Sequence, residues 1–248
     1  MQISRPKKWL LGSGIAVVLL VIGAVVIYLT LIKSDAPPPL TLSSVATTSA
    51  AVSAADNGTT TTLQSNSTAS LTDLSATWKV TDASQVGYRV TEDLIGGLAN
   101  NVAVGRTNAV TGTVTVAGTK VTTVAMSADL TKLKSDQSRR DGQVQDRILS
   151  TRTFPTATFK LTAPIDFGSI PTVGTQNTAK ATGDLTIHGV TKSVALDVSY
   201  ELVSANEIRI LGTLPIVWAD FKIPSPSFAG VANVRDNGAM EFLIVATR

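Results

Sequence analysis

The sequence predicts an all-β protein in which one antiparallel β domain follows an N-terminal transmembrane helix and a disordered linker. Three observations give this organisation. Residues 9–32 form an uncharged apolar run, residues 33–75 are rich in Ala, Ser, Thr and Pro, and residues 76–248 contain repeated segments of alternating apolar and polar side chains. Alternation with a period of two is the pattern of a strand with one buried face.

The apolar run from Trp9 to Ile32 is long enough to cross a membrane. As a helix it would span ~36 Å, compared with ~30 Å for the hydrocarbon core. Basic residues in segment 1–8 precede it and place the N-terminus in the cytoplasm by the positive-inside rule. A cleaved signal peptide is the alternative, but its apolar region is usually only ~7–15 residues long. We expect a retained anchor: a single-pass cell-membrane protein with an extracytoplasmic domain.

The segment 33–75 has no apolar periodicity that could be buried and contains the triple proline Pro37-Pro38-Pro39. Such a composition is typical of a disordered tether. A flexible coil of this length has an end-to-end distance of ~35 Å, which would let the following domain stay clear of the lipid headgroups.

Charge and cysteine content exclude several classes of function. The net charge is +3, three of the basic residues precede the apolar run, and the longest basic run in 76–248 is Arg139-Arg140. A nearly neutral domain without a basic patch has no electrostatic reason to bind phosphates, so we expect no nucleic-acid partner. The chain has no cysteine, which excludes disulfides and thiol chemistry.

About eight strands are expected in the domain 76–248. Turn residues separate several of them: Ala117-Gly118, His188-Gly189 and Asn237-Gly238. The sequential order and short turns indicate antiparallel pairing. The segments are Gln85–Glu92, Val110–Val116, Lys120–Leu130, Ala157–Ile165, Ala179–Ile187, Lys192–Leu202, Glu207–Leu214 and Ala239–Thr247.

One stretch, 135–149, has the pattern of a short helix. Ser138 and Asp141 have the spacing of a capping box, although Gly142 weakens the helix. Asp136 and Arg140 are four residues apart, so a solvated ion pair is the simplest interpretation of these charges. If the helix covers the mouth of a barrel, Arg140 becomes the candidate contact for a phosphate or quinone headgroup.

Eight antiparallel strands favour a closed barrel or a sandwich, and a barrel of about eight strands can hold one small ligand. The alternation predicts which side chains would line its lumen, and nearly all are apolar. An ordinary filled core is the alternative interpretation. The candidate lumen residues are Val86, Tyr88, Val90, Val114, Met126, Ala128, Phe159, Leu161, Leu185, Ile187, Leu196, Val198, Ile210 and Phe242.

Catalytic and metal chemistry have little support in the sequence. His188 is the single histidine, and its place before Gly189 indicates a turn residue that bonds backbone groups at a hairpin. Metal sites with nitrogen or sulfur ligands need several such residues, and no Gly-x-Ser-x-Gly motif occurs in the domain. We expect no enzymatic activity, no metal and no cofactor.

Three motifs in the domain resemble the YceI family of lipocalin-like, polyisoprenoid-binding proteins. Gly183 to Lys192 reads GDLTIHGVTK, similar to the family's hairpin signature; Arg140-Asp141 followed by Phe154-Pro155 and Phe159 resembles its helix region. Trp78-Lys79-Val80 with Val86-Gly87-Tyr88 resembles its opening strands. The chain departs from the family after Arg140-Asp141 and at Trp218–Lys222, where a usual arginine and glycine are missing.

The resemblance implies an eight-stranded lipocalin-like barrel that holds an isoprenoid amphiphile, such as a quinone or polyprenyl lipid, in an apolar lumen. With the anchor at Trp9 to Ile32, it implies a membrane-anchored extracytoplasmic lipid-binding protein. The alternative is a structural or protein-interaction envelope domain with a filled barrel and no ligand. Burial of a long apolar tail contributes ~25 cal/mol per Å², so binding needs no catalytic group.

Overall fold

A computed structural model describes residues 21–23, 36–43, 72–94, 101–224 and 232–248. The chain divides into two compact units, Met1–Asp35 and Ala36–Arg248. In the first unit, residues 21–23 are helical. The rest of the predicted span 9–32 lies outside the described residues. Among the residues that the structure does describe, none forms a helix both long enough and apolar enough to cross a membrane.

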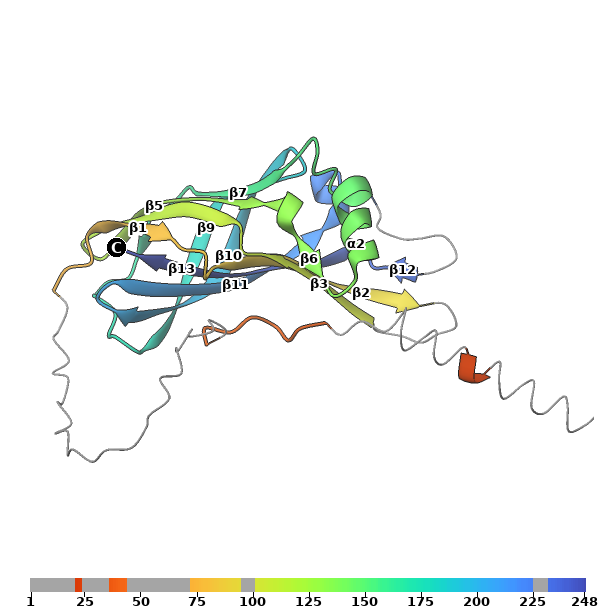
Figure 1. Cartoon of the computed structure of the whole chain (residues 1–248). Helices are drawn as coiled ribbons and strands as arrows, with labels where there is room; N and C mark the ends of the chain where they lie inside the picture. Colours follow the sequence, from red (N-terminus) through yellow and green to blue (C-terminus); the bar gives the residue numbers. More distant parts are fainter. Residues whose placement is uncertain (1–20, 24–35, 44–71, 95–100, 225–231) are drawn as a thin grey trace, which may run out of the picture. The chain divides into compact units, whose positions relative to one another are not determined.

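In its described residues, the second unit is an antiparallel all-β fold with one short α-helix, as the sequence predicts (Figure 1). Its strands are β1 Ala76–Val80, β2 Gln85–Leu94, β3 Asn101–Thr107, β4 Val110–Ala117, β5 Lys120–Asp129, β6 Lys134–Ser135, β7 Thr156–Leu161, β8 Ile165–Asp166, β9 Gln176–Ile187, β10 Val190–Ser204, β11 Glu207–Val217, β12 Ala232–Val234 and β13 Asn237–Thr247.

Eight of these strands close into a barrel in the cyclic order β1-β4-β5-β7-β9-β10-β11-β13, because β13 also pairs with β1. The long pairings β9–β10 and β11–β13 form one continuous wall. Closure removes the free edges that a sandwich would leave. Of the two folds expected from the sequence, the structure therefore confirms the closed barrel and not the sandwich.

β1 and β2 pair with the same edge of β13, each along a different part of that strand. β1 pairs with Ala246 and Thr247, and β2 pairs with residues 239–243. Between the two strands, the buried Ser84 hydroxyl donates to the Val245 carbonyl and accepts from the Val245 amide. Strands β3, β6 and β12 extend the β2 end of the sheet, where α2 also lies (Figure 1).

The predicted helix at 135–149 is shorter and differently capped. α2 spans Ser138–Gln143 and continues as a π-helical turn, Val144–Ile148. The capping-box prediction was wrong: Ser138 is the first helical residue, and Gln137 is the N-cap without a side-chain bond. The Asp141 carboxylate instead accepts from the Ser135 amide and hydroxyl, at 2.8 and 2.7 Å, and ties the helix to β6.

Several predicted strand bounds need correction. The segment 157–165 is two strands, β7 and β8, separated by residues 162–164, where Pro164 lacks an amide for the ladder. β3, Asn101–Thr107, was not predicted, because Ala103, Val104 and Gly105 are all buried and the segment shows no alternation. The turn at His188-Gly189 is confirmed: φ values of 51° and 72° place both residues in the left-handed region.

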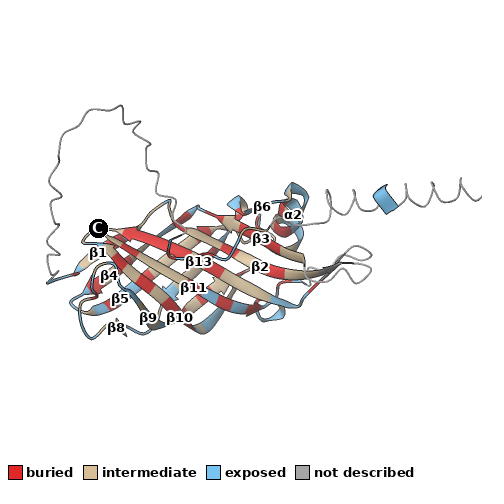
Figure 2. Cartoon of the chain, turned by 90° about the horizontal axis from the view of Figure 1, so that it is seen from below, coloured by how far each residue is buried: buried red, intermediate tan, exposed pale blue. Residues whose placement is uncertain are grey.

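Residues 36–43 lie against the outside of the barrel, although the sequence placed them in a linker. The side chains of Leu40 and Leu42 are each 7% exposed and pack with Leu243 and Val245 of β13. β13 is consequently buried on both faces near its end (Figure 2).

Candidate functional site

Two apolar cavities lie inside the barrel and adjoin each other. The inner cavity has a volume of about 130 Å³ and the outer cavity about 110 Å³. Val86, Ala157 and Met240 line both, so the cavities meet at these three side chains, a boundary here called the constriction. The barrel core is neither filled nor an open tube.

The inner cavity is formed by the β1, β4 and β5 side of the barrel together with β7, β9–β11 and β13. Its lining is almost entirely aliphatic and aromatic, including Trp78, Val114, Phe159 and Tyr200. Gly212 on β11 lies opposite Phe242 on β13, and a Cβ at this position would approach the Phe242 Cε1 to 2.7 Å. The glycine therefore makes room for the ring, and a site with this lining binds by apolar contact.

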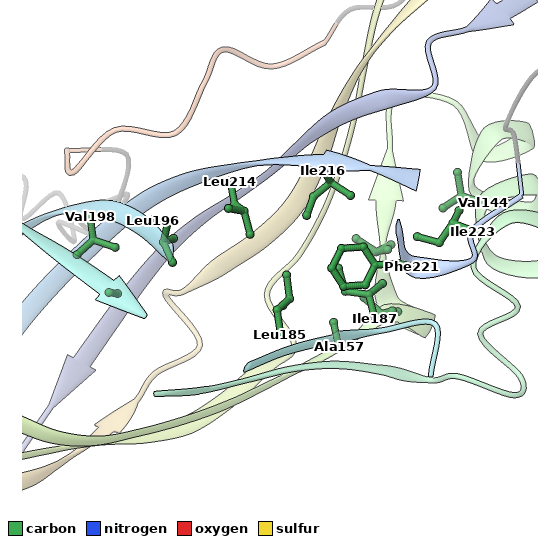
Figure 3. Close-up of a cluster of buried hydrophobic side chains, with 13 residues drawn as sticks. Val144, Ala157, Leu185, Ile187, Leu196, Val198, Leu214, Ile216, Phe221 and Ile223 are labelled. Atoms are coloured by element: carbon green, nitrogen blue, oxygen red, sulfur yellow. The ribbon is translucent and has the colours of Figure 1, made fainter. Parts of the chain in front are cut away.

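A row of buried side chains connects the inner barrel with the helix end (Figure 3). Val198 and Leu196 of β10 lie at one end of this row, Leu185 and Leu214 near its middle, and Val144 of the π-helical turn at the other. The side chains come from opposite walls and point toward one another. The two cavities thus belong to one apolar interior.

The outer cavity is enclosed by the helix region and by the turn after β11. Val144, Ile148 and Leu149 line it from the helix side, and Trp218 and Ile223 line it from the 3-10 turn Trp218–Phe221 and its exit. The Trp218 indole N–H donates to the Arg235 carbonyl at 2.8 Å, which fixes the ring. The helix region thus lines one end of the barrel interior, in agreement with the expectation that the helix covers a barrel mouth.

A small polar group interrupts the apolar lining of the outer cavity. Arg140 of α2 lies 3.6 Å from the Glu92 carboxylate and pairs with Asp136, as its spacing predicted. The side chains of Arg140 and Glu92 are 14% and 13% exposed. The Asn101 amide donates to Glu92 at 2.8 Å. One cation is therefore shared by two carboxylates.

Tyr88 brings a neutral hydroxyl to the same cavity. Burial raises the pKa of Tyr88 far above its usual value; Arg140 opposes this shift, and Asp141, Glu92 and Asp136 add to it. The hydroxyl makes no hydrogen bond within the described part of the chain. It remains a protonated group beside the cavity and can donate one hydrogen bond to a ligand.

The structure places every predicted site residue on the lining of one of the two cavities. Tyr88, Val90, Ile187 and Arg140 line the outer cavity, and Val86 lines both. Contact of these residues with a ligand stays a prediction. The remaining predicted residues, Val114, Met126, Ala128, Phe159, Leu161, Leu185, Leu196, Val198, Ile210 and Phe242, line the inner cavity.

Four important lining residues were not among the predicted ones: Glu92, Ala157, Trp218 and Met240. Glu92 continues the alternation of Val86, Tyr88 and Val90, and Met240 continues that of Phe242, so periodicity could have found both. Ala157 carries almost no hydrophobic signal of its own. Trp218 lies in a 3-10 turn, where strand alternation does not apply.

His188 does not take part in either cavity. Its ring packs on Phe154 with centroids 4.6 Å apart, and its Nδ1 is buried without a hydrogen-bond partner among the described residues. The predicted turn position of His188 is confirmed. The predicted hydrogen bond to the backbone is not formed by Nδ1. Within the described residues, no group of three or more His, Asp or Glu side chains could hold a metal ion.

Comparison with known proteins gives consistent matches. The family model of the YceI-like domain matches residues 78–246. A UPF0312 protein of Vibrio parahaemolyticus is 30% identical over 115 residues, which cover 44% of this chain and 56% of that protein. The chain thus aligns with little more than half of the length of this relative.

Two solved structures share the fold. One is a polyisoprenoid binding domain from Saccharophagus degradans implicated in plant cell wall breakdown (TM-score 0.57, 18% identity, 69% of this chain and 98% of that chain). The other is BcnA of Burkholderia cenocepacia (TM-score 0.52, 24% identity, 68% and 99%). At these identities the likeness concerns the fold alone.

Proposed function

Because the chain belongs to the YceI-like family, we propose that its barrel binds an isoprenoid-type amphiphile, with the tail in the inner cavity and the headgroup in the outer cavity. The observation that carries this proposal is the pair of adjoining cavities: one is almost wholly apolar, and the other has Arg140, Glu92 and Tyr88 in its lining. The solved structure described as a polyisoprenoid binding domain supports it through the shared fold.

The size of the cavities sets a condition on binding. A cavity of ~150 Å³ takes up one benzene molecule, so each cavity in this structure holds only part of an isoprenoid chain. A longer tail requires the constriction at Met240 to open. Methionine is unbranched and has several rotatable bonds, so this side chain can move aside at small cost. Tail burial at ~25 cal/mol per Å² then favours the loaded state.

The charges of the outer cavity favour a neutral headgroup. Arg140 is already paired with Asp136 and lies near Glu92, so this group of three side chains carries one net negative charge. A phosphate would add up to two negative charges beside Glu92. A quinone carbonyl or an alcohol can instead accept from the Tyr88 hydroxyl without this repulsion. We therefore favour a quinone or polyprenol over a polyprenyl phosphate.

In this proposal, residues 9–32 anchor the protein to a membrane, and the barrel binds its ligand without catalysing a reaction. Attachment would raise the local concentration of a lipid ligand, which favours capture by mass action. A structural or protein-interaction role is the second candidate, because the side chains leave only small cavities in the barrel.

Native mass spectrometry of the protein from its own host's envelope, followed by lipid extraction, tests the proposal. We expect a stoichiometric adduct that extracts as a quinone or a polyprenol. In reconstitution, geranylgeraniol should bind at least tenfold more tightly than geranylgeranyl phosphate, a difference of ~1.4 kcal/mol. Glu92→Gln should narrow this ratio, because it removes a negative charge from the cavity.

A matched control is Glu201→Gln, which changes the same charge on β10, at a position outside both cavity linings. It should leave the ratio unchanged. An apo mass in every preparation, together with no thermal shift on adding either probe, would contradict ligand binding and favour the structural role. Tighter binding of the phosphate would retain the lipid site but reject the neutral headgroup.

A further inference from the structure

The segment 36–42, here called the strap, covers an apolar strip on the outside of the barrel. Leu40 and Leu42 are buried against Leu243, Val245 and the half-buried Leu211. These three barrel residues lie on β13 and β11 and point away from the lumen. Two strap leucines thus shield a surface that would otherwise expose three large apolar side chains.

Arginine side chains hold the proline part of the strap. Arg89 of β2 donates to the Pro37 carbonyl at 2.8 Å, and Arg106 of β3 donates to the Pro38 carbonyl at 2.6 Å. Prolines have no amide hydrogen, so a proline segment can be held through its carbonyls alone. At the other end, Arg209 of β11 donates to the Leu42 carbonyl at 3.2 Å.

A buried carboxylate orients the two proline-binding arginines. Glu241 of β13 is 3% exposed and accepts from the Nε atoms of Arg89 at 3.2 Å and Arg106 at 2.8 Å. Arg106 must cross β2 to reach it, and the residue it crosses is Gly87. A Cβ on Gly87 would come within 2.8 Å of the Arg106 Cγ. Glu241 and the two arginines line neither cavity, whereas Gly87 also lines the outer cavity.

We infer that the strap is a built docking contact that shortens the tether of the barrel. Only Lys33, Ser34 and Asp35 separate the predicted span from the strap. Three extended residues reach ~10 Å, whereas a free linker over 34–75 gives ~35 Å. Docking therefore leaves three residues, instead of the whole linker, between the predicted span and the docked strap. The reach limit rests on the proposed membrane anchor; the docking does not.

The strap also meets the barrel beside the outer cavity. Arg89, which binds Pro37, follows the cavity residue Tyr88 directly in β2. The strap therefore contacts the barrel next to the cavity proposed for the headgroup.

Docking can be tested without a membrane, because the full chain has no cysteine. Leu42→Cys should react with a thiol reagent such as Ellman's reagent at least tenfold more slowly than Ser43→Cys, since Leu42 is buried and Ser43 is exposed. Equal rates in folded detergent-solubilised protein would overturn the docking contact.

The reach limit needs the full chain in liposomes of phosphatidylcholine and phosphatidylglycerol. A donor dye on Ala195→Cys, exposed on β10, should transfer energy to an acceptor-labelled lipid. Leu40→Asp with Leu42→Asp should lower the transfer efficiency. Pro39→Asp with Ser43→Asp adds the same charge at exposed positions and should not change it.

The outcomes separate the two parts of the inference. Unchanged transfer in the double leucine variant, with that variant still binding geranylgeraniol, would overturn the reach limit. Failure of the full chain to float with liposomes would overturn the anchor and with it the reach limit, whatever the cysteine rates show about docking.

Discussion

Gly87 shows how a single residue organises two sides of this barrel. On the outer face its missing side chain lets Arg106 cross to Glu241, and on either side of it Val86 and Tyr88 point into the cavities. Glu241 is a buried charge with two arginine partners. Loss of one arginine would leave Glu241 paired with the other, whereas loss of Glu241 would leave both arginines without this counter-charge.

Tyr88 gives a prediction at the scale of one residue. Its pKa is raised above the ordinary value of 10.0, mainly by burial, so the folded state keeps a proton that the unfolded state loses. The stability due to this group is complete below pH 10 and is lost as the pH rises further. Between pH 10 and 11 the loss is up to ~1.4 kcal/mol.

Urea unfolding at pH 8 and pH 11 checks this expectation. Tyr88→Phe should reduce the fall in the free energy of unfolding between pH 8 and pH 11. Burial also raises the pKa of Tyr200, but Tyr200 is present in both proteins, so its contribution cancels in the comparison. A fall of the same size in Tyr88→Phe and in the parent would show that the Tyr88 phenol is not the group responsible.

At the scale of elements, the sequence was most informative where a strand has one buried face. β4, β5, β9 and β10 alternate clearly, so their lumen residues could be predicted by number. β3 is buried on both faces over Ala103–Gly105 and gave no signal. The family resemblance, confirmed by the match over 78–246, supplied what periodicity alone could not, namely the choice of a barrel over a sandwich.

The strap was missed for a related reason. Its leucines are isolated in a proline-rich segment and have no period, so composition alone indicated a linker. The barrel side did carry a signal: Phe242–Ala246 reads FLIVA, and a continuous apolar run indicates a strand covered on both faces. What covers it cannot be deduced locally, because the partner lies some two hundred residues away in the sequence.

The constriction between the cavities gives a prediction about β7 as an element. Ala157 is the smallest residue there, and Ala157→Phe should fill the passage. We expect the affinity for long solanesol to fall at least tenfold, while the shorter farnesol, which needs less of the inner cavity, loses less. Overpacking should also lower the free energy of unfolding by ~1–3 kcal/mol.

Isothermal titration calorimetry with both alcohols measures this difference. Ala125→Phe on β5 is the matched control: it introduces the same ring at a position outside both cavity linings and should not distinguish the two alcohols. Equal losses for farnesol and solanesol in Ala157→Phe would mean that the cavities do not act in series.

At the scale of the whole molecule, the proposal assigns a separate role to each segment of the chain. The anchor keeps the chain at a membrane, the strap limits the reach of the barrel, and the barrel provides an apolar interior. None of these parts requires a reactive group. The anchor falls almost entirely on residues that the structure does not describe, so its support is the sequence: an uncharged run behind Arg5, Lys7 and Lys8.

The absence of cysteine makes the predicted topology directly measurable. Ser4→Cys precedes the span, and Thr153→Cys is exposed on the barrel. In intact cells, or in spheroplasts where an outer membrane is present, a membrane-impermeant maleimide should label Thr153→Cys and should reach Ser4→Cys only after permeabilisation. Labelling of Ser4→Cys without permeabilisation would invert the topology. Release of labelled Thr153→Cys protein into the medium without residues 1–35 would instead establish a cleaved signal peptide, and the barrel would then have to find its lipid by diffusion.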